Sequence, residues 1–168
     1  MKLTSVQDVY ADHLGQLRSV ETQLLEALDE MADAASDKKL RQAFTEHRLQ
    51  TARQLERLEE VIRASPVDVP TETCEAMQGL IADGRKIVTA EAPGDVKDVA
   101  LIAAAQRIEL YEIAVYGTAR ALADQLDQRT ARELLTETLE EEGQTDDLLT
   151  KLATGGLIVA GLNERAHT

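Results

Sequence analysis

The amino-acid sequence predicts an all-α fold, a four-helix bundle with one long crossover that carries a short fifth helix. Apolar residues recur every three or four positions along four long stretches, which is the period of a helix with one buried face. The connection within each pair of stretches is very short, whereas the connection between the pairs is long. Aromatic residues make up only 2% of the chain, so Leu, Ile, Val and Ala must build the core, which suits packed helices better than sheets.

The first pair consists of helices predicted over about 5–35 and about 37–64. Thr4 and Gln7 have the spacing of a capping box at the start of the first helix, and Ser36 is a suitable N-cap for the second. The second helix is expected to end before SPVDVP, because its two prolines break helical structure. Since the turn between them is so short, these helices should lie antiparallel and side by side.

The second half of the chain has a similar plan. A shorter amphipathic segment at about 72–89 predicts the crossover helix, and the last pair is predicted over about 96–126 and about 128–153. The tail, 154–168, has no clear period. Two helix pairs joined by one long crossover form the ferritin-like arrangement, and at this length the chain, 1–168, is expected to form one domain.

Charge and composition exclude several classes of partner. The formal net charge of −13 repels phosphate backbones, and there is no local basic stripe, so no nucleic-acid partner is expected. The longest apolar run, around 99–105, is too short to cross a bilayer, and no membrane partner is expected. The single cysteine, Cys74, excludes an internal disulfide, and no signal peptide is recognisable, so we expect a cytoplasmic protein.

The helix predicted over about 96–126 is apolar on more than one face. Its residues 100–105 read Ala-Leu-Ile-Ala-Ala-Ala. Such a helix needs cover on a second side, either from the crossover helix or from another subunit. Because symmetric dimers are the commonest assemblies, we expect a homodimer.

Each of the four long helices carries a metal-competent residue in its predicted core-facing row. These residues are Glu21, His47, Glu109 and Glu141. Counted from the turns at about 1.5 Å per residue, all four lie near the middle of the bundle. Three of them have a second candidate one turn later on the same helix face: Gln50, Glu112 and Gln144.

Converging carboxylates repel one another in a core unless protons or cations neutralise them. A pair of divalent cations is the simplest explanation, and carboxylates with few imidazoles suit iron or manganese. Bridging carboxylates can hold two such ions about 3.5–4 Å apart. The pattern therefore predicts a dinuclear Fe or Mn cofactor, with a small oxidant or a metal ion as substrate.

Structural interpretations compete with this one. A single Glu in such a row often reaches solvent, and His47 alone could be a hydrogen-bonded core histidine. The amides of Gln50 and Gln144 are poor ligands and usually satisfy core hydrogen bonds. In the run 140–142 only one Glu can point inward, and Glu137 competes with it from one turn away.

The helices resemble a known family, the YciE/YciF-like ferritin-like proteins of bacterial stress responses. The similarity covers about 9–153 and rests on distinctive stretches, among them LRSVETQLLEALDEMA, ALIAAAQRIELYEIAVYGTAR and LLTETLEEEGQTDDLLTKLA. It implies a bundle with a fifth crossover helix and a di-metal carboxylate site related to that of rubrerythrin. By residue matching, the family's ligand candidates are Glu21, His47, Glu109 and Glu141, with Glu112 as a further one.

Two departures from the family bear on function. The family usually has Glu at position 50, where this chain has Gln50, and often His at position 110, where it has Leu110. Losing a carboxylate would weaken a bridging or terminal ligand. Two hypotheses follow: a di-iron or di-manganese protein that handles oxygen, peroxide or ferrous iron, and a non-catalytic helical stress protein with a degenerate site. A DNA-coating mini-ferritin agrees poorly with the acidic charge. Whether the chain is an enzyme stays open.

Overall fold

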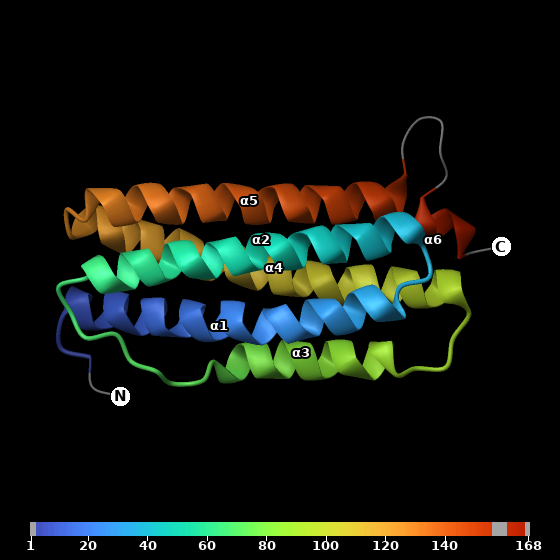
Figure 1. The fold of residues 1–168 in the computed structure, drawn as a ribbon, viewed down its shortest axis with the longest axis horizontal. Helices are drawn as coiled ribbons and strands as arrows, with labels where there is room; N and C mark the ends of the chain where they lie inside the picture. The colour runs from blue at the N-terminus through green and yellow to red at the C-terminus, as the bar shows by residue number, and fades with distance from the viewer. Residues whose placement is uncertain (1–2, 156–160, 167–168) are drawn as a thin grey trace.

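The computed structural model describes residues 3–155 and 161–166, and all secondary-structure elements of these residues are helices. Four are long and two are short (Figure 1). Their bounds are α1 Val6–Ala34, α2 Lys38–Ala64, α3 Glu75–Val88, α4 Gly94–Gln125, α5 Arg129–Thr154 and α6 Leu162–Arg165. None of the described helices is long and apolar enough to cross a membrane.

The four long helices lie along the long axis of the molecule (Figure 1). The helix α1 packs on α2 and α4 packs on α5, and α3 lies in the crossover between these pairs, where it contacts α1 and α4. The predicted all-α bundle with a fifth crossover helix is therefore confirmed. For the tail, 154–168, the sequence predicts no element; α6 forms within it, and 156–160 and 167–168 lie outside the described residues.

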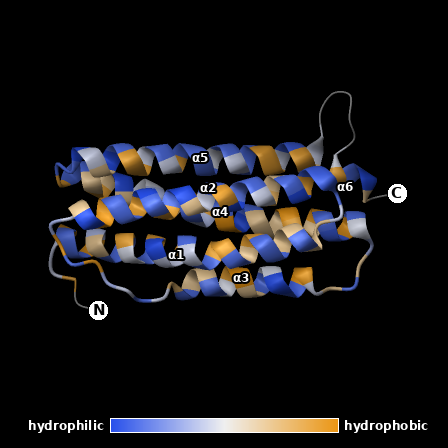
Figure 2. Ribbon diagram, in the orientation of Figure 1, coloured by the Kyte–Doolittle hydropathy of each residue, from blue (hydrophilic) through white to orange (hydrophobic). Residues whose placement is uncertain are grey.

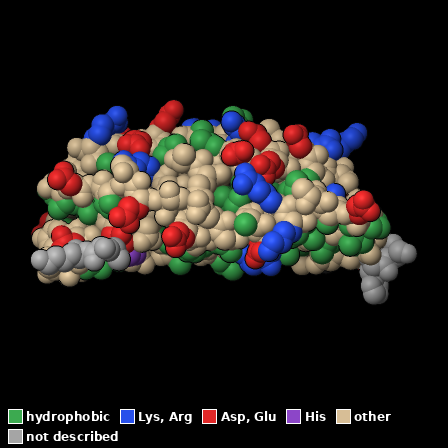
Figure 3. All heavy atoms as spheres, turned by 90° about the horizontal axis from the view of Figure 1, so that it is seen from below, with side chains coloured by type: hydrophobic (Ala, Val, Ile, Leu, Met, Phe, Trp, Pro, Cys, Tyr) green, Lys and Arg blue, Asp and Glu red, His purple; other side chains and the backbone are tan. Residues whose placement is uncertain are grey.

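The helix α4 is covered from more sides than a bundle helix usually is. Besides α1 and α5, it contacts α3 and α6. Seen from the side of α3, hydrophobic side chains lie in separate patches among acidic and basic ones (Figure 3). The apolar faces of α4 thus find partners within the chain, so its all-round apolar character does not by itself require a second subunit.

Two helix starts differ by one residue from the sequence prediction. The N-cap of α1 is Ser5, whose hydroxyl accepts from the backbone N–H of Asp8 at 3.2 Å, rather than Thr4 with Gln7. The Asp8 carboxylate also accepts the backbone N–H of Thr4 and of Ser5, which an amide does less well. The N-cap of α2 is Asp37 rather than Ser36, and its carboxylate accepts two backbone N–H groups of the first turn.

The apolar core consists of two clusters, one in each half of the bundle. Orange and blue residues alternate along each long helix in Figure 2, as amphipathic packing requires. The cluster near the α1–α2 turn includes Leu24, Phe44, Leu101 and Leu149. The cluster at the other end includes Leu14, Leu58, Tyr116 and Leu135. The helices pass from one cluster to the other through a layer of buried polar side chains at mid-bundle.

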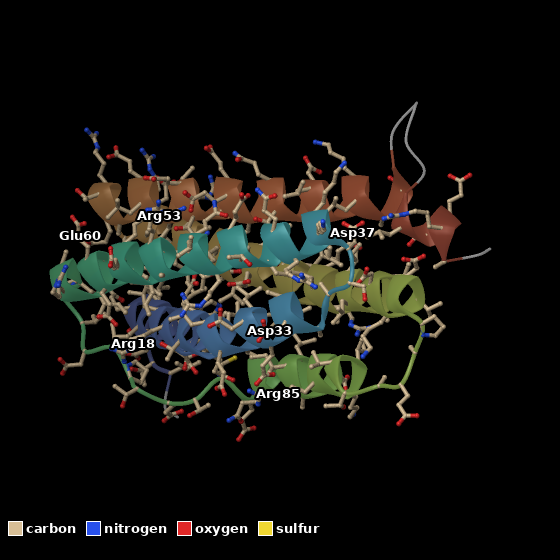
Figure 4. The ribbon with its side chains drawn as sticks, turned by 45° about the vertical axis from the view of Figure 1, so that its right-hand side comes forward. Arg18, Asp33, Asp37, Arg53, Glu60 and Arg85 are labelled. Atoms are coloured by element: carbon tan, nitrogen blue, oxygen red, sulfur yellow. The ribbon has the colours of Figure 1, made fainter. Side chains whose placement is uncertain are left out.

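The two helix pairs are joined at one end by a buried carboxylate. Asp98, on α4, is 0% exposed and accepts the backbone N–H groups of Ser36 and Asp37, each at 2.8 Å. Asp37, labelled in Figure 4, lies at the turn between α1 and α2. Asp98 therefore satisfies donors that the short turn would otherwise bury without a partner, and it fixes the depth of one helix pair against the other.

Asp98→Asn should destabilise the fold by about 2 kcal/mol, or lower Tm by roughly 5 °C. The amide oxygen can still accept one of the two backbone N–H groups, but the amide nitrogen cannot accept the other. Thermal unfolding followed by circular dichroism would measure this. The matched control is Asp95→Asn, at an exposed position on the same helix, which should leave Tm nearly unchanged. Equal Tm values for the two variants would contradict the role given to Asp98.

Candidate metal centre

The polar layer at mid-bundle contains a tight group of metal-competent side chains. His47 from α2, Glu109 and Glu112 from α4, and Glu142 from α5 each offer one ligand atom, and these atoms lie within 4.8 Å of one another. All four residues are buried, with exposures of 5%, 1%, 1% and 0%. Glu109 and Glu112 are three residues apart, so one helix face presents both carboxylates to the same point.

Glu21 brings a further carboxylate from α1. It is 0% exposed, and the buried hydroxyl of Tyr116 donates a hydrogen bond to its Oε1. Its charge interacts with those of His47 and Glu109, which places it beside the group of four. The centre therefore draws on all four long helices, and Tyr116 holds the carboxylate from α1 in place.

The polar atoms of this centre converge without satisfying one another. His47 Nε2 lies 3.2 Å from Glu109 Oε1, yet neither ring nitrogen has an aligned hydrogen-bond partner. Buried carboxylate oxygens of Glu21, Glu109, Glu112 and Glu142 also lack partners. Unpartnered buried polar atoms are rare in native proteins, and several that face a common point are typical of ligands around an ion.

The charges at the centre are not balanced by basic side chains of the chain. Among the ion pairs of the described residues, one involves a carboxylate of the centre, and it joins Glu109 to His47. Glu21, Glu112 and Glu142 take part in none of these pairs. Burial raises the pKa of Glu21 to about 7. The pKa of Glu112 is raised well above its usual range, first by burial and then by the charge of Glu142. The pKa of Glu142 is also raised well above its usual range, first by burial and then by the charge of Glu109. Burial by itself would lower the pKa of His47, but the negative charges of Glu109 and Glu21 have the larger combined effect, so the pKa is raised overall.

Glu141 does not point into the centre, so its predicted place in the core-facing row is wrong. It accepts hydrogen bonds from Gln54 and Arg57 on α2, both at 3.0 Å, and is 21% exposed. Burial would raise its pKa, but the hydrogen bond and charge of Arg57 lower it overall. Glu142 occupies the inward position instead.

Helix geometry explains this error. Successive residues are turned by about 100° around the helix axis, so Glu141 and Glu142 lie on either side of the direction of Thr138 at similar angles. Periodicity alone therefore does not tell which of the two glutamates faces the core. The buried residues Leu135 and Leu149 show which face of α5 points into the core. The sequence prediction instead places their neighbours Leu134 and Leu148, which are half-buried and exposed, in the core-facing row with Glu141. The cation of Arg57 then holds Glu141 outside.

The two glutamines differ in burial. Gln144 is exposed, so the expectation that it is a second inward residue on its helix is also wrong. Gln50 is half-buried and its amide affects the pKa of both His47 and Glu141, so it lies between the centre and the outer carboxylate. The structure thus places Glu21, His47, Glu109 and Glu112 together, as the sequence predicts, and adds Glu142 and the hydrogen-bond partner Tyr116. Their role as metal ligands stays a prediction.

A groove leads from the surface to the centre. It lies between α2 and α5, has a volume of about 400 Å³, and includes His47 and Glu109 among its lining residues. Phe44, Leu49 and Leu148 supply apolar walls. The groove therefore brings solvent to the edge of His47 and Glu109, while the ring nitrogens of His47 stay buried.

Comparison with known proteins places the chain in a family. Residues 5–163 match the family described as Domain of unknown function (DUF892). The chain belongs to the DUF892 family. It is similar to Protein YciF of Escherichia coli strain K12, with 44% identity over 154 residues, covering 91% of this chain and 93% of that protein. The resemblance to YciE/YciF-like proteins inferred from the helix sequences is thereby confirmed.

Solved structures share the fold of this DUF892 chain. The crystal structure of the E. coli stress protein YciF superposes with a TM-score of 0.87 at 44% identity, covering 89% of this chain and 95% of that one. YcfI from Rhodopseudomonas palustris gives a TM-score of 0.86 at 32% identity, covering 90% and 97%. The chain is thus a helical relative of a stress protein, with a buried His and Glu group that could hold a metal ion.

The metal-free protein should lose stability as pH rises from about 5 to about 8. Glu21 has a pKa near 4.5 when unfolded and about 7 when folded, so between these values the folded state holds a proton that the unfolded state releases. The free energy of unfolding therefore falls with pH, and the raised pKa values of Glu112, Glu142 and His47 have the same sign.

Thermal unfolding of chelator-treated protein would show a fall in Tm of roughly 5 °C over this range. Glu21→Gln should reduce the fall of Tm with pH, because glutamine still accepts the hydrogen bond of Tyr116 but does not titrate. Glu141→Gln removes the same charge at a site where the pKa is lowered, so it should not reduce the slope. A Tm that rises with pH in the wild-type protein would contradict the assignment.

Proposed function

We propose that the chain is a di-metal carboxylate protein that binds two ferrous or manganous ions and handles oxygen, peroxide or ferrous iron. The observation that carries this proposal is the convergence of three buried carboxylates and one imidazole, with the buried carboxylate of Glu21 beside them and several of their polar atoms unpartnered. Ionised, Glu21, Glu109, Glu112 and Glu142 carry four negative charges, which two divalent cations balance.

The donor set agrees with this choice of metal. Carboxylate oxygens with one imidazole suit iron and manganese, whereas zinc and copper sites favour more nitrogen and sulfur ligands. His47, Glu109, Glu112 and Glu142 would hold the ions, with Glu21 as a further ligand. When bound, iron or manganese supplies the electrons that oxygen or peroxide accepts.

The chain's own residues prepare this centre in three ways. Tyr116 orients the Glu21 carboxylate through its hydrogen bond. The two apolar clusters on either side exclude water from the carboxylates and strengthen their attraction for cations. The groove beside His47 admits the reactant from solvent.

A second function deserves a test, because the centre has a single imidazole and Gln50 stands where the resembling family usually has Glu. In this alternative the chain is a non-catalytic stress protein in which protons on the carboxylates replace the metal, as the raised pKa values of Glu112 and Glu142 allow. In either case we propose a stress-related role in the cytoplasm, by analogy with the E. coli relative, and a homodimer.

Metal content should separate the two functions. After anaerobic loading with ferrous iron or manganese and desalting, mass spectrometry should find about two ions per wild-type chain. Glu142→Gln should lose most of this metal, since it removes a ligand from the group of four. Glu141→Gln is the matched control on the adjacent residue, whose carboxylate binds Arg57 instead, and should retain it.

If no sample retains metal, the degenerate-site function is correct and the di-metal proposal fails. Equal loss in both variants would show that charge near α5, rather than coordination by Glu142, governs metal retention. Where two ions are retained, oxygen uptake and peroxide consumption by the loaded protein would establish which oxidant it handles.

A further inference from the structure

The groove between α2 and α5 is larger and more apolar than the proposed reactants require. Oxygen or hydrogen peroxide needs about the space of one or two water molecules, roughly 30 Å³ each. The groove has about 400 Å³, which lies within the range of sites for organic molecules. The groove therefore has room for an organic molecule.

The walls combine apolar side chains with polar ones such as Gln50 and Thr145. Here Ala43, Phe44 and Leu149 line the groove, and Leu49 and Leu148 add side chains that are 53% and 41% exposed. An aliphatic ligand between these two leucines would remove apolar surface from water.

The floor of the groove is polar. His47 and Glu109 line it, and the ring nitrogens of His47 and one carboxylate oxygen of Glu109 lie buried just beneath its surface without an aligned partner. An anionic head group would be repelled there by Glu109 and by Glu142 behind it. A neutral hydroxyl or hydroperoxide can donate to a carboxylate and accept from an imidazole N–H.

The rim adds little net charge. Arg53 lies on α2 on the side toward α5, as Figure 4 shows, and Glu46 lines the same groove. One positive and one negative side chain offset each other, so the rim does not select for a charged ligand. The selection therefore rests on the apolar walls and the polar floor.

We propose that this groove binds a neutral aliphatic molecule with a terminal hydroxyl or hydroperoxide, with the chain between Leu49 and Leu148 and the oxygen end at His47 and Glu109. That the hydroperoxide is a substrate rests on the proposed function. Cleavage of its O–O bond gives one alcohol and one water and takes up two electrons and two protons. If His47, Glu109, Glu112 and Glu142 held two ferrous ions, their oxidation to ferric would supply the two electrons, and solvent would supply the protons.

Binding can be tested without metal. Hexanol added to the metal-free, isotope-labelled protein should shift amide resonances of groove residues in a saturable manner, and hexanoate should bind about tenfold more weakly because its carboxylate is repelled. Leu148→Glu should weaken hexanol binding by about tenfold or more. The matched control, Leu110→Glu, changes a leucine that is 57% exposed and outside the groove, and should leave binding unchanged.

Other outcomes would overturn the proposal. These are no saturable shift, shifts outside the groove, equal loss in the two variants, or tighter binding of hexanoate than of hexanol. On iron-loaded protein, the rate with tert-butyl hydroperoxide relative to hydrogen peroxide should fall in Leu148→Glu and not in Leu110→Glu. A chain that retains no metal would end the substrate role and the proposed function together, while the hexanol result would still decide whether the groove is a binding site.

Discussion

The rest of the structure depends on one constraint, the burial of four carboxylates at mid-bundle with a single imidazole as their charged neighbour. Like charges at such short separations disfavour the folded state unless protons or cations bind. The fold offsets this cost elsewhere, through the two apolar clusters on either side and through Asp98, which joins the helix pairs at one end. Stability therefore resides in the two ends, and the middle is available for binding.

Arg57 and Tyr116 separate two kinds of carboxylate. Arg57 neutralises Glu137 and Glu141 near the surface of α5, so these residues do not need to be buried or protonated. Tyr116 offers Glu21 a hydrogen bond but no charge, so Glu21 stays in the core with its charge unbalanced. Among the described residues, Arg57 acts on Glu21 through its charge but makes its ion pairs with Glu137 and Glu141, so a proton or a metal ion is left to neutralise the centre.

Periodicity and connection lengths were enough to predict the helices, the crossover and most of the centre. Glu21 and His47 could be found because each lies in a row whose apolar members are unambiguous, such as Leu17 and Leu24 around Glu21. Glu109 and Glu112 could be found because they are carboxylates one turn apart on a helix that is apolar on more than one face. The row of α5 was ambiguous, because Leu134 and Leu135, like Leu148 and Leu149, are adjacent leucines that support two phases. The contact of Glu141 with Arg57, 84 residues away in the chain, then decides between them, and no local pattern contains it.

Protons and metal ions compete for the same oxygens in this centre. Burial that raises the pKa of Glu21 to about 7 also means that a cation must displace protons in order to bind near neutral pH, so its affinity increases as pH rises. The same carboxylates thus stabilise the metal-free fold when protonated and the metal-bound fold when ionised. A degenerate site would retain the first state alone. Because both states need the same buried positions, burial cannot distinguish them. The distinction lies in the geometry of Glu109, Glu112 and Glu142 around His47, whose ligand atoms lie within 4.8 Å of one another and could hold an ion.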